Sequence, residues 1–240
     1  KALKPVYKKD VPEDAEVLTS HMFVVDKFDA NGEYDKKKAR MVSHGNEQNA
    51  ELHPNKSSPT AAIHSLLTVL ALYAGKTEYQ MGKVDIKGAF VQTPMTGPPI
   101  YMKISKNIVK YIVEIFPEYT KYVTQEGTLY TRMLKAMYGC VQASRLWFEH
   151  LTKVLQEAGY KAAGMDECVW RRVDGKKTHV IVVYVDNLLI FATKKEMEAL
   201  KALFVKNFRW ITMEVTEKVS YLGMQINRWD NQVEVGMDFF

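Results

Sequence analysis

The chain has 240 residues, 47% of them hydrophobic and 25% charged, and a formal net charge of +5 at pH 7. These values describe an ordinary globular protein with apolar content for one large domain or two small ones, and the mildly basic charge permits a nucleic-acid partner without requiring one. Two cysteines, Cys140 and Cys168, exclude a disulfide framework, and the lack of a long apolar run or a secretory signal argues against a membrane span and against export. We therefore expect an intracellular protein without a membrane partner, whose numbering can begin inside a longer polypeptide because Lys1 is not a methionine.

The N-terminal part predicts a β-hairpin. Residues 1–20 are polar and contain proline, so we expect a loose segment there, and residues 21–44 hold two strand-like runs around Asn31-Gly32, the strongest short turn dipeptide. Since side chains alternate along a strand, one face of the return strand carries three basic residues: Lys36, Lys38 and Arg40. They are either lysines that guard a solvated edge strand or a cationic rail for phosphates, on which Arg40 would form a two-pronged contact.

Helix and strand signals alternate in the middle of the chain. Ser58 as N-cap and Pro59 at the first helical position predict a helix that stops at Gly75. The run YQMGKVDI predicts a short strand that carries Asp85 near its end, and KGAF follows it. We expect further strands at IYMKI and TLYTRMLK, with a helix between them that ends before Pro117.

The strongest helix signal covers residues 140–158, CVQASRLWFEHLTKVLQEA, whose apolar side chains form one stripe and which the tight turn Tyr138-Gly139 precedes. The central element is THVIVVYVDNLLIFAT, residues 178–193, where two β-branched runs flank Asp186-Asn187 and predict a hairpin with a two-residue loop. A helix at 194–208 and two final strands follow. Strands, hairpins and helices interspersed in this way predict an α+β fold with an antiparallel sheet.

Asp85 and Asp186 are carboxylates at strand ends, about a hundred residues apart in sequence. Asp186 and Asn187 can simply form the turn, since both residue types tolerate left-handed backbone. If the strands pair, the two carboxylates would meet and offer the hard oxygen ligands that Mg²⁺ prefers. Two such ions can activate an attacking hydroxyl and stabilise a leaving oxygen in phosphoryl transfer, but spacing alone leaves both interpretations open.

Five motifs in sequence order resemble the reverse transcriptase of copia-type LTR retrotransposons, and they cover nearly the whole chain. KKKARMVSHG resembles the fingers strand KARLVAKG, and KVDIKGAF resembles the first catalytic motif of the family. LKAMYGCVQASRLWF is similar to LYGLKQAPRAW, YVDNLLI to YVDDLLI, and YLGMQI to YLGIxI. Five ordered matches are far more specific than a lone YVDD-like tetrapeptide, which occurs by chance.

The resemblance implies a right-hand polymerase fold in a single domain over residues 1–240, with fingers at about 1–78 and 94–135 and a palm at about 79–93 and 136–240. The palm would hold an antiparallel sheet packed on helices, and this chain would contain no thumb or RNase H domain. The implied reaction adds a deoxynucleoside triphosphate to a primer 3′-hydroxyl on an RNA or DNA template and releases pyrophosphate. Thumb and RNase H domains of a longer polyprotein are further implied partners, in the cytoplasm, the nucleus or a virus-like particle.

The resemblance also assigns site residues. Asp85, Asp186 and Asn187 would be catalytic, and Asp85, Ile86 and Asp186 would hold two Mg²⁺ ions, for which Mn²⁺ can substitute. Six residues would lie near the nucleotide: Lys38, Arg40, Phe90, Tyr138, Gly139 and Gln142. A flat Phe90 ring under the sugar would leave no room for a 2′-hydroxyl.

The chain departs from the family pattern most at Asn187, where the family has a second aspartate. Asparagine keeps an oxygen ligand but no charge, and losing a charge-assisted contact in a reacting site costs a few kcal/mol, roughly a hundredfold in rate. The other departures are Ala61, Ala62 and Ile63 in place of basic residues, His44 in place of Lys, and Ser144 in place of Pro. We expect a weakened polymerase; the alternatives are an inactive or domesticated nucleic-acid-binding module, and a different metalloenzyme built on a palm-like sheet.

Overall fold

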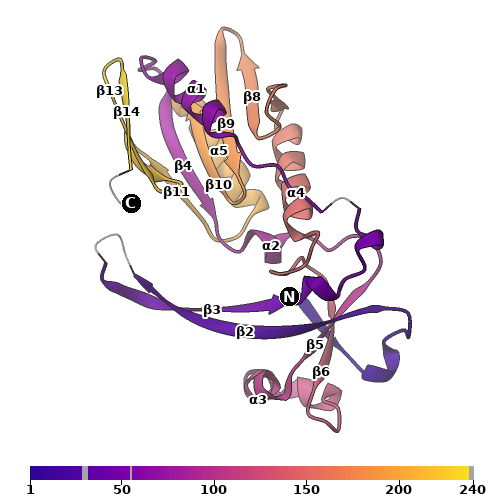
Figure 1. Cartoon of the computed structure of the whole chain (residues 1–240). Coiled ribbons are helices and arrows are strands. Elements are labelled where there is room, and N and C mark those ends of the chain that lie inside the picture. Colours follow the sequence, from indigo (N-terminus) through magenta and orange to yellow (C-terminus); the bar gives the residue numbers. More distant parts are fainter. Residues whose placement is uncertain (29–31, 55, 238–240) are drawn as a thin grey trace. The chain divides into compact units, whose positions relative to one another are not determined.

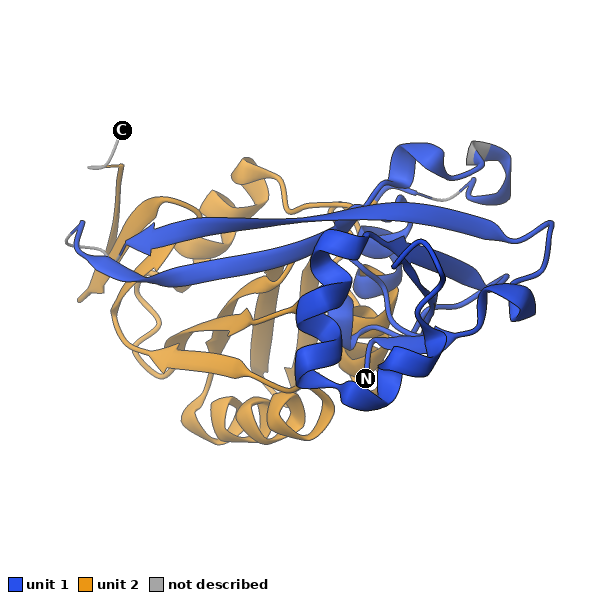
Figure 2. Cartoon of the chain, turned by 90° about the horizontal axis from the view of Figure 1, so that it is seen from below, with its two compact units in different colours: residues 1–57, 90–147 blue, residues 58–89, 148–240 orange. Residues whose placement is uncertain are grey.

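The computed structural model describes residues 1–28, 32–54 and 56–237. The chain divides into two compact units, residues 1–57 with 90–147 (unit 1) and residues 58–89 with 148–240 (unit 2), which Figure 2 colours blue and orange. Helices and mostly antiparallel strands occur in both units, which confirms the predicted α+β class. The expected boundaries of fingers and palm stay a prediction.

Unit 1 is built on a five-stranded sheet. Its strands, in spatial order, are β1 (Leu3–Val6), β6 (Leu129–Met133), β5 (Ile100–Ile104), β2 (Glu16–Phe28) and β3 (Tyr34–Ser43). Only the β2–β5 pair is parallel among the described strands. The prediction that residues 1–20 are loose is wrong, because β1 pairs with β6 from Leu3↔Met133 to Val6↔Tyr130 and β2 already begins at Glu16. The expected turn at Asn31-Gly32 falls partly outside the described residues.

Short helices complete unit 1. They are α3 (Lys106–Ile115), the four-residue α2 (Ala89–Gln92) at the unit boundary, and the 3₁₀ turns η1 (Lys8–Asp10), η2 (Gly45–Glu47), η3 (Ala50–Leu52) and η4 (Pro117–Tyr122). The helix expected before Pro117 is therefore confirmed as α3. Buried apolar residues of the sheet, among them Leu18, Met102 and Leu129, pack with Val109 of α3 into one core. This core fixes the position of β3 and of the segment that follows β6.

Unit 2 is built on a six-stranded antiparallel sheet, seen in Figure 1 with β4, β10, β9 and β8 side by side. The strands are β11 (Ile211–Val215), β4 (Gln80–Ile86), β10 (Asn187–Ala192), β9 (Lys177–Tyr184), β8 (Val169–Asp174) and β7 (Lys161–Ala162). A second sheet follows, made of β12 (Lys218–Tyr221), β13 (Met224–Trp229) and β14 (Gln232–Gly236). The helices are α1 (Ile63–Tyr73), α5 (Lys194–Asn207) and α4 (Ala143–Glu157), which crosses the unit boundary.

Both faces of the large sheet are covered. Gly82 faces α5, since a Cβ placed there would meet Met197 Sδ at 2.9 Å. Met81, its neighbour on β4, points the other way and packs with Leu70 of α1 and with Tyr221 of β12. The central strands are therefore buried on both sides, which explains their continuous apolar runs.

Helix α1 begins later than its sequence predicts. Ser58 and Pro59 lie outside any helix or strand, and the helix starts at Ile63 with Ala62 as N-cap. Ala62 has no side chain that can cap the helix, and the carboxylate of Asp166 accepts its backbone N–H at 3.0 Å instead. Asp166 is 104 positions away in sequence, so the local pattern could not indicate this start.

Arg228 joins the small sheet to the rest of unit 2. It is a buried residue of β13, and it donates to the backbone carbonyl of Tyr73 at 3.2 Å and to Glu217 at 2.8 Å. Its guanidinium also lies 5.8 Å from the centre of the Phe191 ring. A buried cation with this many partners holds the three-stranded sheet against α1 and β10.

Four buried groups of unit 2 (Tyr73, Tyr160, Cys168 and Tyr221) have a pKa raised by burial, and they make its stability depend on pH in the alkaline range. Burial raises the pKa of the Cys168 thiol to about 12, and burial likewise raises the pKa of Tyr73 to about 12. The folded chain therefore keeps protons that an unfolded chain releases near pH ~8.5 for cysteine and ~10 for tyrosine. Their contribution to stability is complete below pH ~8.5 and falls as the pH rises toward ~12.

We accordingly expect the urea midpoint of unit 2 to be lower at pH ~10.5 than at pH ~8. Hydrogen-exchange mass spectrometry across a urea series, read on peptides of β8 and β9, measures it. Cys168→Ala removes one of these groups and should show a smaller decrease between the same pH values. A decrease as large as that of the unchanged chain would show that the Cys168 thiol does not contribute.

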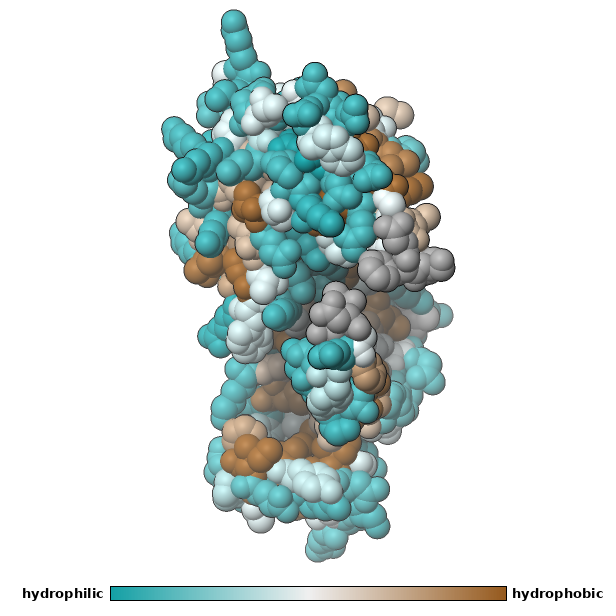
Figure 3. All heavy atoms as spheres, turned by 90° about the vertical axis from the view of Figure 1, so that its left-hand side faces the viewer, coloured by the Kyte–Doolittle hydropathy of each residue, from teal (hydrophilic) through white to brown (hydrophobic). Residues whose placement is uncertain are grey.

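Figure 3 shows one face of the molecule, on which hydrophilic groups predominate and hydrophobic groups are interspersed. Exposed large apolar residues come from several elements, for example Ile115, Met165 and Trp210, as is usual for globular proteins. None of the helices in the described ranges combines the length and the apolar character that crossing a bilayer requires.

Candidate functional site

Asp85 lies near the end of β4, in the middle of three paired strands of unit 2. The register places it opposite Asn187 of β10 on one side and Thr212 of β11 on the other. Directly paired residues point to the same face of a sheet, so these three side chains form one row. Asp85 and Asn187 are half-buried and Thr212 is exposed, so the row is open to solvent at the β11 side.

Asp186 is brought to the same end of the sheet by the turn between β9 and β10. Its backbone carbonyl accepts the N–H of Ile86 at 3.0 Å, and its carboxylate accepts the side-chain amide of Asn187 at 3.1 Å. The two carboxylates that the sequence singled out thus belong to neighbouring positions of one sheet end.

The turn itself is displaced by one residue from the predicted one. Tyr184 pairs with Asn187, so the two-residue loop is Val185-Asp186, and Asn187 is the first residue of β10. Val185 has a φ of 54°, in the left-handed region where a β-branched residue is rare and strained. Both faces of β9 and β10 are apolar and buried, and a pattern of that kind does not reveal the register.

Tyr221 supports the hairpin from β12. Its hydroxyl donates toward the backbone carbonyls of Asn187 at 3.4 Å and Val182 at 3.5 Å. The ring is buried, and burial raises the pKa of Tyr221, so the hydroxyl stays a donor at neutral pH. The sequence placed Tyr221 in the YLGMQI motif without giving it this role.

The oxygen atoms at this sheet end suit a hard divalent cation. Side chains at this sheet end carry the carboxylates of Asp85 and Asp186 and the amide oxygen of Asn187, and the backbone carbonyl of Ile86 stays a predicted ligand. Mg²⁺ is bound through few carboxylates, with water and substrate phosphates completing its shell, so this donor set fits it. No group of three or more His, Cys, Asp or Glu side chains suited to a metal occurs in the described part of the chain, so the two carboxylates are not joined by a third.

Unit 1 brings together three of the residues predicted to lie near a nucleotide. The Arg40 guanidinium lies 5.3 Å from the centre of the Tyr138 ring, and the Phe90 ring centre lies 5.1 Å from that of Tyr138. Arg40 Nε is buried and has no hydrogen-bond partner among the described residues. Lys38 lies two positions earlier on the same face of β3 and is exposed. Arg40 is a planar cation that packs on a ring, and its Nε–H remains available as a donor. Such a guanidinium can bind a phosphate.

Gly139, also predicted near the nucleotide, is required by packing. Its φ is +90°, and a Cβ there would overlap the Ser43 carbonyl oxygen and meet Val42 Cγ1 at 2.7 Å. The end of β3 is held against this turn by Ser43, whose backbone N–H donates to the Tyr138 carbonyl at 2.8 Å. Gly45 also approaches Gly139 closely, since a Cβ on Gly45 would overlap the Gly139 carbonyl. The glycines of the two motifs therefore let two chain segments touch.

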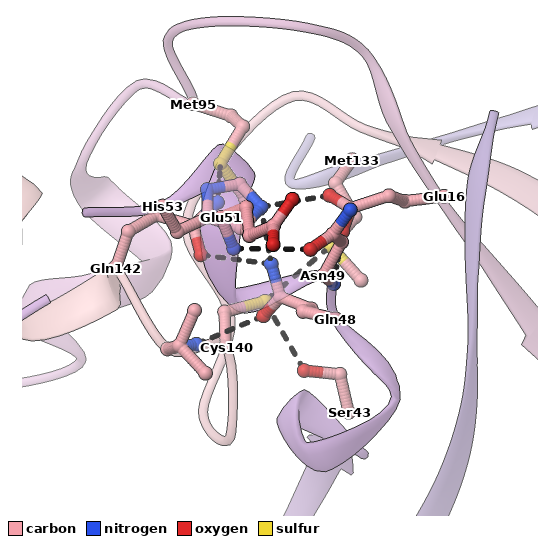
Figure 4. Close-up of polar contacts among 11 residues, drawn as sticks. Glu16, Ser43, Gln48, Asn49, Glu51, His53, Met95, Met133, Cys140 and Gln142 are labelled. Carbon is pink, nitrogen blue, oxygen red and sulfur yellow. Dashed lines mark hydrogen bonds and ion pairs between the residues drawn. The ribbon is translucent and has the colours of Figure 1, made fainter.

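Gln142 is the sixth predicted nucleotide residue, and the structure places its side chain in a buried polar network (Figure 4). Its Oε1 accepts from Gln48 Nε2 at 3.0 Å, and its Nε2 donates to Met95 Sδ at 3.6 Å. Gln48 Oε1 in turn accepts the N–H of Val141 at 2.9 Å. Gln48 is not among the predicted site residues, because nothing in the local pattern indicates that its side chain bonds two consecutive residues, 93 and 94 positions away.

The same network continues to a half-buried contact between a histidine and a glutamate. His53 Nε2 lies 2.7 Å from Glu16 Oε2, and the other oxygen of Glu16 accepts the backbone N–H of Asn49 at 2.7 Å (Figure 4). These contacts fix the loop after β3 next to the start of α4. His44, which replaces a family lysine, lies outside this network and contacts Thr19 Oγ1 and His21 Nδ1, each at 2.7 Å.

Comparison with known proteins identifies the family. The sequence profile described as reverse transcriptase (RNA-dependent DNA polymerase) matches residues 6–239. The chain is 25% identical over 219 residues to the retrovirus-related Pol polyprotein from transposon RE2 of Arabidopsis thaliana, covering 90% of this chain and 14% of that protein. It is 26% identical over 194 residues to the corresponding polyprotein from transposon TNT 1-94 of Nicotiana tabacum, covering 80% of this chain and 13% of that protein. The chain thus spans about a seventh of the length of these relatives.

A solved structure supports the fold. Telomerase from Candida albicans, in complex with a fragment of telomeric RNA, matches with a TM-score of 0.52 at 8% identity, over 98% of this chain and 47% of that one. Identity this low supports a shared fold alone. The resemblance to reverse transcriptases of copia-type elements is confirmed by the family match and the Pol polyproteins, and the chain belongs to the reverse transcriptase (RNA-dependent DNA polymerase) family.

Proposed function

We propose that this chain is the nucleotide-adding part of a reverse transcriptase, which extends a primer 3′-hydroxyl on an RNA or DNA template. The observation that carries the proposal is the register of unit 2, which pairs Asp85 with Asn187 and anchors Asp186 beside Ile86. Family membership supports the same reaction class. The 3′-hydroxyl attacks the α-phosphate of a deoxynucleoside triphosphate, and pyrophosphate leaves.

In this proposal Asp85 and Asp186, with the Ile86 carbonyl, hold Mg²⁺. Bound there, Mg²⁺ supplies charge neutralisation at the reacting phosphate and lowers the pKa of the attacking hydroxyl. The protein's share is positioning: the β4–β10 register sets the spacing of the ligands, and the strained Val185 turn holds Asp186 at the sheet end. Asn187 contributes an oxygen without a charge, so this site is weaker than one with three carboxylates.

Unit 1 supplies the contacts to the nucleotide. We assign Arg40 and Lys38 to the triphosphate, because Arg40 retains a free Nε while it lies over Tyr138. Phe90, which packs on Tyr138, is assigned to the sugar, where its ring excludes a 2′-hydroxyl. Gly139 and Gln142 are assigned a positioning role. Gly139 permits the close approach to Ser43, and Gln142 accepts a hydrogen bond from Gln48.

The partners follow from the reaction. A primer annealed to an RNA or DNA template and deoxynucleoside triphosphates are the substrates, and thumb and RNase H domains would be supplied by a longer polyprotein of the kind that the relatives are. We place the protein inside the cell, in the cytoplasm, the nucleus or a virus-like particle.

A second candidate function is supported by Asn187 itself. With two carboxylates instead of three, the chain can keep the fold and bind nucleic acid while the chemistry is lost. That module would bind a primer–template with an affinity that falls as salt rises, and it would show no turnover.

Single-nucleotide primer extension with Mg²⁺ separates the two functions. The unchanged chain should extend a primer slowly, and Asp85→Asn should lower the rate by roughly a hundredfold or more, because a neutral amide replaces a charged metal ligand. Thr212→Val, which alters the neighbour of Asp85 without touching a carboxylate, is the matched control and should retain most of the activity. Equal rates for Asp85→Asn and the unchanged chain would contradict the proposed site.

A further inference from the structure

A second surface of unit 1 combines lysines with aromatic rings, of which Tyr7 and Phe116 are exposed and Tyr119 and Tyr122 half-buried. It is formed by the N-terminal segment 1–10, which contains β1 and η1, and by residues 116–122, which contain η4. We call it the lysine–aromatic surface: Lys1, Lys4, Lys9 and Lys121 with Tyr7, Phe116, Tyr119 and Tyr122. None of these residues is among those assigned to the metal or the nucleotide. The motifs that identify the family do not include them either.

The rings on this surface are arranged in two pairs. Tyr7 and Tyr122 have centroids 4.7 Å apart, and Phe116 and Tyr119 stack with centroids 5.3 Å apart and planes 23° apart. Tyr7 is 40% exposed and Phe116 is 41% exposed, so both rings present free area to solvent. Exposed stacked rings on a positively charged background are the usual platform for unpaired bases.

The lysines lie next to these rings. Lys121 Nζ is 5.2 Å from the Tyr122 ring centre, Lys9 Nζ is 5.7 Å from Tyr7, and Lys1 Nζ is 5.4 Å from Tyr119. Residues 1–10 and 116–122 together contain five lysines against two acidic residues, Asp10 and Glu118, an excess of three positive charges. This local excess is most of the net charge of +5 that the whole chain carries.

A groove of about 240 Å³ lies in the part of the surface formed by β1 and η4, within unit 1. Its lining includes Lys4 and Lys121 together with Tyr119 and Tyr122, and Glu118 is the acid in it. Cations and ring faces therefore border one depression, as a strand with a phosphate backbone and flat bases requires.

We propose that the lysine–aromatic surface binds single-stranded nucleic acid, with bases on Tyr7 and Phe116 and phosphates on the neighbouring lysines. A duplex fits less well, because its bases are stacked inside and cannot reach the rings. An acidic peptide would match the lysines but would leave the exposed ring faces unused. Binding here requires no catalysis and is independent of the carboxylates of unit 2.

Fluorescence anisotropy with the whole 240-residue chain tests this, using labelled oligo(U) and oligo(dT) of about 20 nucleotides and a duplex of equal length. The surface variant is Lys4→Ala/Lys9→Ala/Lys121→Ala. The matched control is Lys194→Ala/Lys195→Ala/Lys201→Ala, which removes the same charge from exposed positions of α5. Thermal melts of both variants verify that they are folded.

The surface variant should bind single strands at least about tenfold more weakly, and the magnitude of its log–log salt slope should fall by about two, from three lost phosphate contacts at ~0.7 each. The control should change less than about twofold. Equal losses in the two variants would overturn the proposal, as would duplex binding that decreases as much as single-strand binding, or displacement of the oligonucleotide by polyglutamate at an equal concentration of charge.

Photocrosslinking with 4-thiouridine in the oligonucleotide locates the contact directly. Crosslinked peptides should include Tyr7 or residues 116–122, and crosslinks found only elsewhere in the chain would reject the surface. Tyr7→Leu/Phe116→Leu should reduce crosslinking while it keeps every lysine, which tests stacking apart from charge. The surface variant leaves Asp85 and Asp186 intact and should retain single-nucleotide primer extension at saturating primer–template, so failure of the polymerase proposal and failure of this one give different results.

Discussion

Replacing Asn187 by aspartate is expected to raise the rate of primer extension by roughly a hundredfold. The substitution is isosteric and changes one amide nitrogen to a charged oxygen. Asn187 pairs with Asp85 and donates its amide to Asp186, so the new carboxylate would lie between the two existing ones. A third charge at this position increases the attraction for Mg²⁺ and the neutralisation available to the reacting phosphate.

The same substitution should also lower the stability of the chain when no cation is present, because it adds a negative charge next to two others. Three carboxylates at one sheet end repel each other when no cation is present, so Asn187→Asp should melt at a lower temperature than the unchanged chain in EDTA. Added Mg²⁺ should raise its melting temperature by more than it raises that of the unchanged chain, since a ligand stabilises the state that binds it. Differential scanning fluorimetry over a Mg²⁺ series measures both effects.

Asn107→Asp is the control for net charge, because it adds one negative charge at an exposed position of α3 in unit 1. It should leave both the extension rate and the Mg²⁺-dependent melting shift unchanged. If Asn187→Asp shows the larger Mg²⁺ shift without any extension, the chain has kept a metal site and lost the reaction. If neither the shift nor the rate increases, the assignment of this sheet end as the metal site is wrong.

Elements with a complete local signal were predictable from the sequence. Helix α3 ends where Pro117 removes a backbone donor, and α5 occupies 194–207 with an apolar stripe that includes Leu200 and Phe204. Helix α4 has its predicted apolar stripe buried, for example at Trp147 and Leu151. In each case the information that fixes the helix lies within the helix and its flanks.

Features that depend on distant partners were not predictable. Helix α1 begins at Ile63 because Asp166 accepts the Ala62 N–H, and no residue near Ser58 records that contact. Strand β1 forms because β6 offers an edge to a segment that reads as polar coil. The structure of a short or weakly patterned segment is determined by the residues that it contacts in the fold, and those residues are far away in the sequence.

The candidate site likewise contains residues that the sequence indicated and residues whose roles depend on distant contacts. The sequence indicated Asp85 and Asp186 because strand-end carboxylates stand out in apolar runs, but it placed the turn one residue late. The reason is that two faces buried by apolar residues fit either register. Gln48 and Tyr221 support the site through contacts across the fold, and a single sequence gives no sign of them. The roles of the predicted site residues stay predictions until they are measured.

Gly139→Ala is expected to destabilise unit 1 by several kcal/mol, about 3–5 kcal/mol in all. Part of this is the left-handed backbone at φ +90°, which costs an alanine about 1–2 kcal/mol. The rest arises because the new Cβ would overlap the Ser43 carbonyl oxygen, a backbone atom that cannot rotate away. Relief requires β3 to separate from the turn before α4, which breaks the Ser43–Tyr138 hydrogen bond.

Gly97→Ala separates the two contributions. Gly97 has a φ of +86° in the same unit, and a Cβ there would meet no atom within 4 Å, so only the backbone term of about 1–2 kcal/mol applies. Hydrogen-exchange mass spectrometry across a urea series, read on peptides that contain β3 and the 138–142 turn, measures both variants. Since Arg40 on β3 lies over Tyr138 beside Gly139, Gly139→Ala should also weaken nucleotide binding, whereas Gly97→Ala should not. Equal destabilisation by the two variants would show that the close approach of Ser43 and Gly139 contributes nothing, and that the glycine of this motif serves its backbone angle alone.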